Sequence, residues 1–375
     1  MLLALLVALG AHPAVAAHSC HRPAILDDGW QVTTPEAAGL DAGALCAALD
    51  DTAARANIHA IVVERHGRLV AELYRRGLDR QAWSFFTREV DFGPTTVHDL
   101  RSVTKSVVGL LFGIAQADGR LGALSTPVLE FYPDEPDLRS RGRDAITLEH
   151  LLTMSSGLQW NEDFAAYGSR TNNDTRLYWT WSIHRYVLDR PVVAIPGSHW
   201  NYNGGTAAVL GEIVTRAVGS SLPELARARL FEPLAIHDWK WLSDLYGRPM
   251  AEGGLRMRPR DMAKIGRLML NRGLWHGRQI VPADWVATSL RPHIPVDDDG
   301  LQYGYLWWTA TVDHHGRRLP WAAGFGNGGQ RIFLVPDLDL SLVVTAGGYS
   351  DPDIGRLERG LLDLVVNAVD DRPRS

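Results

Sequence analysis

Strand-like segments occur near both ends of this chain, and the long stretch between them is mostly helical. The strand-like segments cover residues 60–63, 68–73, 305–310, 331–335 and 340–345. The first two flank His66-Gly67, a typical hairpin signal. Strands of this kind need partners to satisfy their backbone groups, so the two chain ends are expected to meet in one antiparallel sheet.

Helical periodicity predicts helices at both ends and throughout the middle of the chain. The predicted helices cover residues 41–54, 102–117, 148–154, 206–217, 261–271 and 354–369. The sheet part is then expected over about 40–100 and 300–370, and the helical part over about 101–299. We expect the α/β (α+β) class: one domain over residues 18–375, with a sheet formed from both chain ends, flanking helices and an inserted helical region.

Composition restricts the kind of partner. The 375 residues are 46% hydrophobic and 22% charged, which is enough to bury a large core. The formal net charge is −5, with acidic and basic residues interspersed. A small-molecule substrate is therefore expected in preference to nucleic acid.

The first 17 residues resemble a secretory signal. They contain no charged side chain, include an apolar run over residues 2–9, and end in the small-x-small pattern Ala14-Val15-Ala16. The alternative is an apolar N-terminal helix of the fold. The run is too short to span a bilayer, and no other segment has about 18 uninterrupted apolar residues. Export to the periplasm or medium is expected, without a stable membrane span.

The two cysteines, Cys20 and Cys46, would both remain after cleavage of the signal. A disulfide can persist in an exported protein, so the two residues are candidates for a pair. The sequence leaves the pairing open, because the two residues need not lie close together.

The segment Ser102-Val103-Thr104-Lys105 carries the first chemical signal. It opens an apolar helical run, and a spacing of three puts the Ser hydroxyl and the Lys amine on one helix face. A Ser hydroxyl becomes a nucleophile when a neighbouring base takes its proton, and a desolvated amine can be that base. The helix start also favours an oxyanion. The alternative is a structural pair, in which Ser102 caps the helix and Lys105 extends to solvent.

Several segments in the same order resemble the serine β-lactamase-like family, which includes class C β-lactamases, D-alanyl-D-alanine carboxypeptidases and related esterases and amide hydrolases. The resemblance covers roughly residues 35–370. Its main segments are 100–106 (Leu-Arg-Ser-Val-Thr-Lys-Ser), 146–158 (Ile-Thr-Leu-Glu-His-Leu-Leu-Thr-Met-Ser-Ser-Gly-Leu) and 196–205 (Pro-Gly-Ser-His-Trp-Asn-Tyr-Asn-Gly-Gly). It implies the β-lactamase/transpeptidase-like fold and acyl transfer through Ser102.

The resemblance also implies a third catalytic group, and it shows two departures. Tyr202 matches the family's catalytic tyrosine, which moves protons among the nucleophile, the lysine and the leaving group. The family usually has Asn two residues after this tyrosine, whereas this chain has Asn203 one residue on and Gly204 at the usual place. We include Asn203 as a candidate substrate contact.

The family's Lys-Thr-Gly strand is the second departure. Its counterpart is Ala322-Ala323-Gly324-Phe325, which lacks the cation that recognises a β-lactam carboxylate. The glycine-rich segment from Gly324 resembles the strand edge of esterase-like members, where the backbone can approach the substrate closely. Gly324 and the N–H of Phe325 are therefore candidates for the second part of the oxyanion site. The alternative is a strand-edge turn without a catalytic role.

Other signals are weaker. His314-His315 could suggest a metal, but the sequence has no His-Glu-x-x-His pattern and no paired-cysteine ligand set, so a solvated loop is expected. Asp261 is interpreted as a helix cap.

We therefore expect a serine hydrolase that cleaves an ester or amide through an acyl-Ser102 intermediate, with Lys105 and Tyr202 as general base and acid, and without cofactor or metal. The expected substrate is a small ester, amide or short peptide. The alternatives are a D-amino-acid peptidase, penicillin-binding protein or weak β-lactamase, and a non-catalytic binding protein with the same fold.

Overall fold

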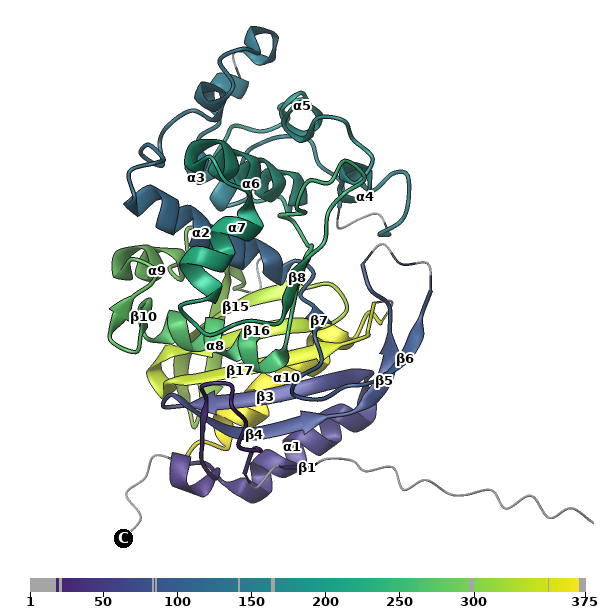
Figure 1. Cartoon of the computed structure of the whole chain (residues 1–375), viewed down its shortest axis with the longest axis vertical. Coiled ribbons are helices and arrows are strands. Elements are labelled where there is room, and N and C mark those ends of the chain that lie inside the picture. The colour runs from purple at the N-terminus through teal and green to yellow at the C-terminus, as the bar shows by residue number, and fades with distance from the viewer. Residues whose placement is uncertain are drawn as a thin grey trace, which may run out of the picture.

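The computed structural model describes residues 18–19, 22–82, 84, 86–140, 142–162, 166–296, 300–349 and 351–370. Figure 1 shows a sheet in the lower half of the molecule and a mostly helical region above it. The sheet is built from both chain ends, since purple N-terminal strands lie beside yellow C-terminal ones. The predicted α/β (α+β) architecture is thereby confirmed.

The main sheet has the strand order β1-β4-β3-β17-β16-β15-β14-β13-β12, and β2 pairs with β4 outside this path. Its strands are β1 (His18–Ser19), β2 (Gln31–Val32), β3 (Ile58–Arg65), β4 (Arg68–Tyr74), β12 (Ile294–Pro295), β13 (Gln302–Tyr303), β14 (Trp308–His314), β15 (Arg317–Gly326), β16 (Gln330–Val335) and β17 (Leu340–Ala346). All neighbours along the path are antiparallel. The shorter strands outside it are β5 (Arg76–Asp79), β6 (Arg88–Asp91), β7 (His98–Asp99), β8 (Trp239–Trp241), β9 (Leu255–Met257), β10 (Leu274–Trp275) and β11 (Arg278–Gln279).

Two local features explain how the chain ends join. The predicted hairpin turn between β3 and β4 has His66 and Gly67 at φ angles of 53° and 75°, the left-handed values that a tight two-residue hairpin requires. On its other edge β3 pairs with β17, where Val62 lies opposite Val343. The first long strand and the last therefore lie side by side near the centre of the sheet.

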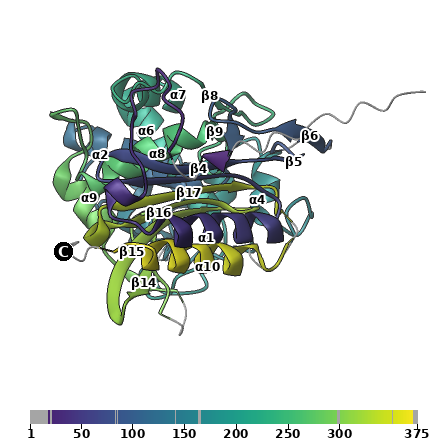
Figure 2. The same ribbon diagram turned by 90° about the horizontal axis from the view of Figure 1, so that it is seen from below.

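Helices cover both faces of the sheet. The helices are α1 (Ala42–Arg55), α2 (Val103–Ala117), α3 (Leu148–Leu152), α4 (Asn173–Leu177), α5 (Ile183–Leu188), α6 (Gly204–Val218), α7 (Leu222–Ala226), α8 (Pro259–Leu270), α9 (Ala283–Ser289) and α10 (Ile354–Asn367). Figure 2 shows α1 and α10 side by side on one face. On β3, Ile61 and Val63 belong to the core beneath these two helices, whereas Val62 belongs to the core shared with α2 and α8. This alternation is what a sheet buried on both faces produces.

One predicted strand is partly wrong. Residues 305–310 were expected to be extended, but β14 begins only at Trp308 because Leu306 has a left-handed φ of 61°. The amide of Leu306 donates to Leu152 O, so this segment bonds to the helical region before the strand starts. β15 was not among the strands predicted from periodicity, but it contains Ala322 to Phe325, where the family resemblance implies a strand.

The predicted signal segment, residues 1–17, lies outside the described residues, and so does Cys20. Cys46 lies in α1, and its pairing with Cys20 stays a prediction. Within the described ranges, no helix combines the length and the apolar character needed to cross a membrane.

Candidate active site

Ser102 and Lys105 meet at the start of α2. Ser102 is the residue that precedes the first helical turn, and Lys105 lies one turn along. Lys105 Nζ donates hydrogen bonds to Ser102 Oγ and to Glu252 O, each at 2.8 Å. Lys105 is only 2% exposed, so its amine is held against the serine instead of extending to solvent. The alternative of a surface lysine beside a helix cap does not fit this geometry.

The backbone before Ser102 is strained. Arg101 has a φ of 51°, a left-handed conformation that costs a non-glycine residue about 1 kcal/mol or more. Its side chain is fixed by a hydrogen bond to Arg80 O at 2.6 Å and an ion pair with Asp99 at 3.3 Å. These contacts hold the turn that presents Ser102 at the helix start. Within the described part of the chain, the Ser102 amide donates to no other group, so it remains available as an oxyanion donor.

Tyr202 lies beside the same lysine. Lys105 Nζ is 5.0 Å from the centre of the Tyr202 ring, and the ring itself is largely buried. On its other side the ring stacks on Trp308, with centroids 5.8 Å apart. The structure thus brings together the three residues that sequence reasoning selected as catalytic, from α2 and from the segment just before α6.

Asn203 has a structural role. It is 1% exposed and precedes α6, and its Oδ1 accepts a hydrogen bond from Thr206 N at 3.2 Å. This is an N-cap, which satisfies a backbone N–H at the helix start. A contact between Asn203 and substrate stays a prediction.

Three carboxylates beside the nucleophile were missed by sequence reasoning. They belong to Glu162, to Asp174 in α4 and to Glu252 between β8 and β9. Burial, reinforced by Glu162, raises the pKa of Asp174, and burial raises the pKa of Glu252 to about 7. The charge of Lys105 opposes both shifts. Because the three residues lie on separate loops and elements, no local spacing in the sequence reveals them.

Glu162 is the fixed member of this group. Its Oε2 accepts hydrogen bonds from Gly204 N at 2.7 Å and Trp160 Nε1 at 2.9 Å, and its Oε1 accepts one from Tyr167 OH at 2.9 Å. Asp174 Oδ1 is buried with no hydrogen-bond partner among the described residues. A Cβ atom on Gly204 would overlap this oxygen. Asp174 therefore occupies the space next to the position where the family usually has Asn.

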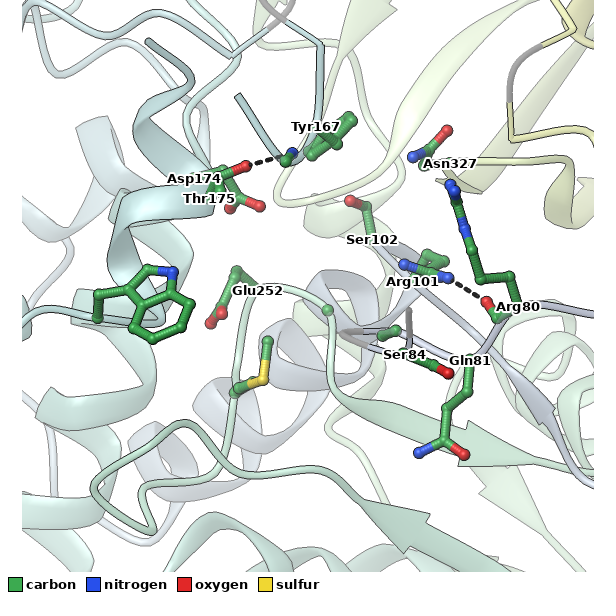
Figure 3. A pocket seen from close by; sticks show the side chains of 15 residues that line it. Arg80, Gln81, Ser84, Arg101, Ser102, Tyr167, Asp174, Thr175, Glu252 and Asn327 are labelled. Carbon is green, nitrogen blue, oxygen red and sulfur yellow. Dashed lines mark hydrogen bonds between the residues drawn. The ribbon is translucent and has the colours of Figure 1, made fainter. Parts of the chain in front are cut away.

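A pocket of about 360 Å³ opens over Ser102. Figure 3 shows Ser102 near its centre, with Asp174, Glu252 and Tyr167 on one side and Arg80, Arg101 and Asn327 on the other. Trp179 contributes an apolar wall. The pocket thus has an acidic side and a basic side, with the nucleophile between them.

The glycine-rich strand β15 passes the start of α2. A Cβ atom on Gly324 would lie 3.0 Å from Ser106 Oγ and 3.2 Å from Val103 Cγ1, so the close approach requires a glycine or a shifted neighbour. Phe325 stacks on Trp308, with ring centroids 5.2 Å apart. These contacts place the predicted oxyanion segment against the nucleophile helix, while donation by the Phe325 amide stays a prediction.

The basic residue that could replace the missing strand lysine is already paired. Arg331 Nη2 lies 2.8 Å from the buried Glu358 Oε2, and its Nη1 donates to Gly326 O at 2.9 Å. Arg331 therefore holds β16 to α10 and to the end of β15. Of the basic residues on the pocket wall, Arg101 is paired with Asp99, whereas Arg80 has no ion pair among the described residues.

Known proteins resemble this chain in sequence and in fold. A family model described as Beta-lactamase matches residues 50–365. The 6-aminohexanoate-dimer hydrolase of Paenarthrobacter ureafaciens is 28% identical over 332 residues, which are 83% of this chain and 78% of that protein. Esterase EstB of Burkholderia gladioli is 33% identical over 225 residues, 56% of this chain and 55% of the esterase. The structure of a class C β-lactamase superposes with a TM-score of 0.64 at 13% identity, covering 87% of this chain and 96% of the other.

Proposed function

The chain belongs to the β-lactamase family, and we propose that it is a serine hydrolase that cleaves an ester or amide through an acyl-Ser102 intermediate. Two of its relatives are named as a 6-aminohexanoate-dimer hydrolase and an esterase, which supports hydrolysis as the kind of reaction. The observation that carries the serine mechanism is the 2.8 Å hydrogen bond between Lys105 Nζ and Ser102 Oγ in a buried site.

The reaction proceeds in two halves. Lys105 Nζ takes the hydroxyl proton as general base while Ser102 Oγ attacks the substrate carbonyl, and backbone N–H groups at the start of α2 stabilise the oxyanion. Tyr202, held beside Lys105, passes a proton to the leaving alcohol or amine when the tetrahedral intermediate collapses. Water then attacks the acyl-Ser102 ester, with the same groups moving the proton in reverse, and releases the acid.

The acidic side of the pocket supports a substrate with a cationic amine. Asp174 Oδ1 lacks a hydrogen-bond partner among the described residues, and burial raises the pKa of both Asp174 and Glu252. A bound ammonium group would supply the missing donor and favour the ionised carboxylates. The amine-terminated, amide-linked substrate that the name 6-aminohexanoate-dimer hydrolase implies for that relative has this chemistry.

Two esters that differ only in charge test the proposal. We expect kcat/KM for the p-nitrophenyl ester of 6-aminohexanoic acid to exceed that for the matched heptanoate ester by about tenfold, and Asp174→Asn to remove most of this preference. The exposed Asp137 provides the control variant Asp137→Asn, which should leave the preference unchanged. Equal rates for the two esters would refute the amine preference. Absence of hydrolysis of esters and amides alike would refute the serine hydrolase itself.

A further inference from the structure

A second cluster of reactive side chains lies next to the pocket, and the proposed reaction does not use it. His59 in β3, Asp79 at the end of β5 and His98 in β7 are 0%, 2% and 0% exposed. One ligand atom from each side chain lies within 4.8 Å of the other two. Asp79 directly precedes Arg80, which lines the pocket.

Hydrogen bonds fix the orientation of His98. Its Nδ1 lies 2.9 Å from Asp99 O, and because a carbonyl oxygen can only accept, the proton must be on Nδ1. His98 Nε2 then carries a lone pair, which accepts from His59 Nδ1 at 2.7 Å. Histidines that bind metals typically donate their other ring N–H to such a carbonyl. His98 Nε2 is thus oriented as a ligand.

Two atoms of the cluster lack hydrogen bonds. His59 Nε2 and Asp79 Oδ1 are buried without a hydrogen-bond partner among the described residues. Asp79 Oδ1 is 3.9 Å from His98 Nε2, beyond hydrogen-bonding distance, and the described residues include no Lys or Arg paired with Asp79. By contrast, the nearby Asp99 pairs with both Arg101 and Arg256. A buried carboxylate without a cation is costly, so the cluster is one positive charge short.

An aromatic side chain covers the cluster. Phe92 stacks on the His59 ring with centroids 4.0 Å apart and contributes an apolar cover.

We propose that His59, His98 and Asp79 bind one zinc ion. Two imidazole nitrogens and one carboxylate oxygen form a donor set that zinc accepts. Ligands at zinc distances of about 2.0–2.1 Å in a tetrahedron are roughly 3.3 Å apart. The observed separations of 2.7 Å and 3.9 Å lie on either side of this value. Binding requires a small adjustment and movement of the His59 proton from Nδ1 to Nε2, so that the imidazole stays neutral, and water is the fourth ligand.

The ion would be structural. It would tie β3, β5 and β7 together, and β7 leads through Leu100 and Arg101 directly to Ser102. The three ligands are about 20 residues apart along the chain, which matches no short metal motif, so the sequence did not reveal them. This inference is independent of the proposed hydrolase function.

The test uses tag-free full-length protein, freed of metal with a chelator and titrated with Zn²⁺ by calorimetry. We expect one equivalent to bind, the melting temperature to rise with Zn²⁺, and Co²⁺ to give the visible absorption of a four-coordinate site. Asp79→Asn and His98→Gln should each weaken zinc binding at least tenfold. His315→Gln, in the histidine pair at the end of β14, is the matched control and should bind as the wild type does.

Two results would overturn the proposal. One is a wild-type protein that stays folded by circular dichroism after metal removal and then takes up no Zn²⁺, a result that needs no variant. The other is zinc binding that survives both cluster substitutions but is lost in His315→Gln. A metal-free protein that unfolds and refolds only when Zn²⁺ is added would support the proposal.

Discussion

Gly204 and Asp174 share one small space at the active site: a Cβ atom on Gly204 would overlap Asp174 Oδ1. The family resemblance places an asparagine at this position, two residues after the tyrosine. Here Gly204 has no side chain, and the carboxylate of Asp174 in α4 fills the space that the asparagine would need. The glycine at position 204 therefore leaves the space that the Asp174 carboxylate occupies.

This relationship predicts a specific rescue. Gly204→Asn should lower kcat/KM at least tenfold, because the new side chain must displace the Asp174 carboxylate. Combining it with Asp174→Gly should restore part of the activity, since the double variant frees the space. Kinetics of the two single variants and the double variant measure the coupling. Gly219→Asn is the control, because nothing lies within 4 Å of a Cβ at that position and Asn tolerates its left-handed φ. Additive losses in the double variant would contradict the shared space.

Lys105 and Tyr202 are expected to be needed for chemistry. Lys105→Ala and Tyr202→Phe should each reduce kcat by about 100-fold or more, the scale of a positioned acid or base, while the protein stays folded. Tyr132→Phe is a matched control, because Tyr132 is buried and its hydroxyl has no hydrogen-bond partner among the described residues. Activity near that of the wild type in Lys105→Ala or Tyr202→Phe would exclude that residue from the mechanism.

His184 predicts a pH dependence of stability. Its ring nitrogens lie 2.8 Å from Glu212 and 2.7 Å from Glu135. Burial alone would lower the pKa of His184, but hydrogen bonds with these glutamates raise it overall above 6.5. A raised folded-state pKa gives stability that is full below the unfolded pKa and is lost as the pH rises through the folded value. Burial alone would raise the pKa of Glu212, but the hydrogen bond with His184 lowers it overall. The stability that comes from this lowered pKa is lost as the pH falls.

The contribution should therefore be largest between about pH 5 and 6.5. In this window His184→Gln is expected to lower the free energy of unfolding by about 2 kcal/mol, and by less at pH 9. Urea denaturation at pH 5.5 and pH 9 measures the difference. His237→Gln, at an exposed histidine, is the control. A loss that is the same at both pH values would show that His184 acts by packing alone.

Ordinary esters should be better substrates than β-lactams. A β-lactam carries a carboxylate close to its reactive carbonyl, and the strand residue that would supply a cation is Ala322. Arg331 is engaged with Glu358, and the acidic side of the pocket repels a second carboxylate. We expect kcat/KM for a short-chain p-nitrophenyl ester to exceed that for a chromogenic cephalosporin by at least tenfold.

Arg80 lines the pocket and is the cation that could bind a β-lactam carboxylate, against the expected preference for esters. If the cephalosporin is cleaved as efficiently as the ester, the inference from Ala322 is wrong. A selective loss of cephalosporin turnover in Arg80→Ala would then identify the cation on the pocket wall. Arg359→Ala, at a distance from the pocket, provides the control.

Sequence patterns predicted the features of this molecule that depend on residues close together in the chain. Ser102 and Lys105 are one helical turn apart, and the His66-Gly67 turn needs only two residues with positive φ. Tyr202 was found only through the family resemblance. Local patterns do not predict contacts between residues that are far apart in the chain. Glu252 is about 150 residues from Ser102, and its carbonyl nevertheless accepts a hydrogen bond from Lys105.

The errors in strand prediction also come from contacts between residues that are far apart in the chain. Tyr305 to Trp307 read as extended because they are apolar and aromatic, but the amides of Tyr305 and Leu306 donate to Ser289 O and Leu152 O in the helical region. In β15, Gly324 and Gly326 weaken the strand pattern, yet both are needed where the strand passes close to the segment around Ser102. In both segments, contacts with distant parts of the chain determine the backbone conformation and override local strand propensity.

The central claim is that Ser102 is the nucleophile, and covalent labelling tests it directly. The purified protein would be treated with a fluorophosphonate probe, digested, and the adduct located by mass spectrometry. The account predicts one adduct on Ser102, with labelling lost in Ser102→Ala and retained in Ser106→Ala, whose hydroxyl is buried against Leu306 O. An adduct on another residue, or hydrolytically active protein that is not labelled, would contradict it.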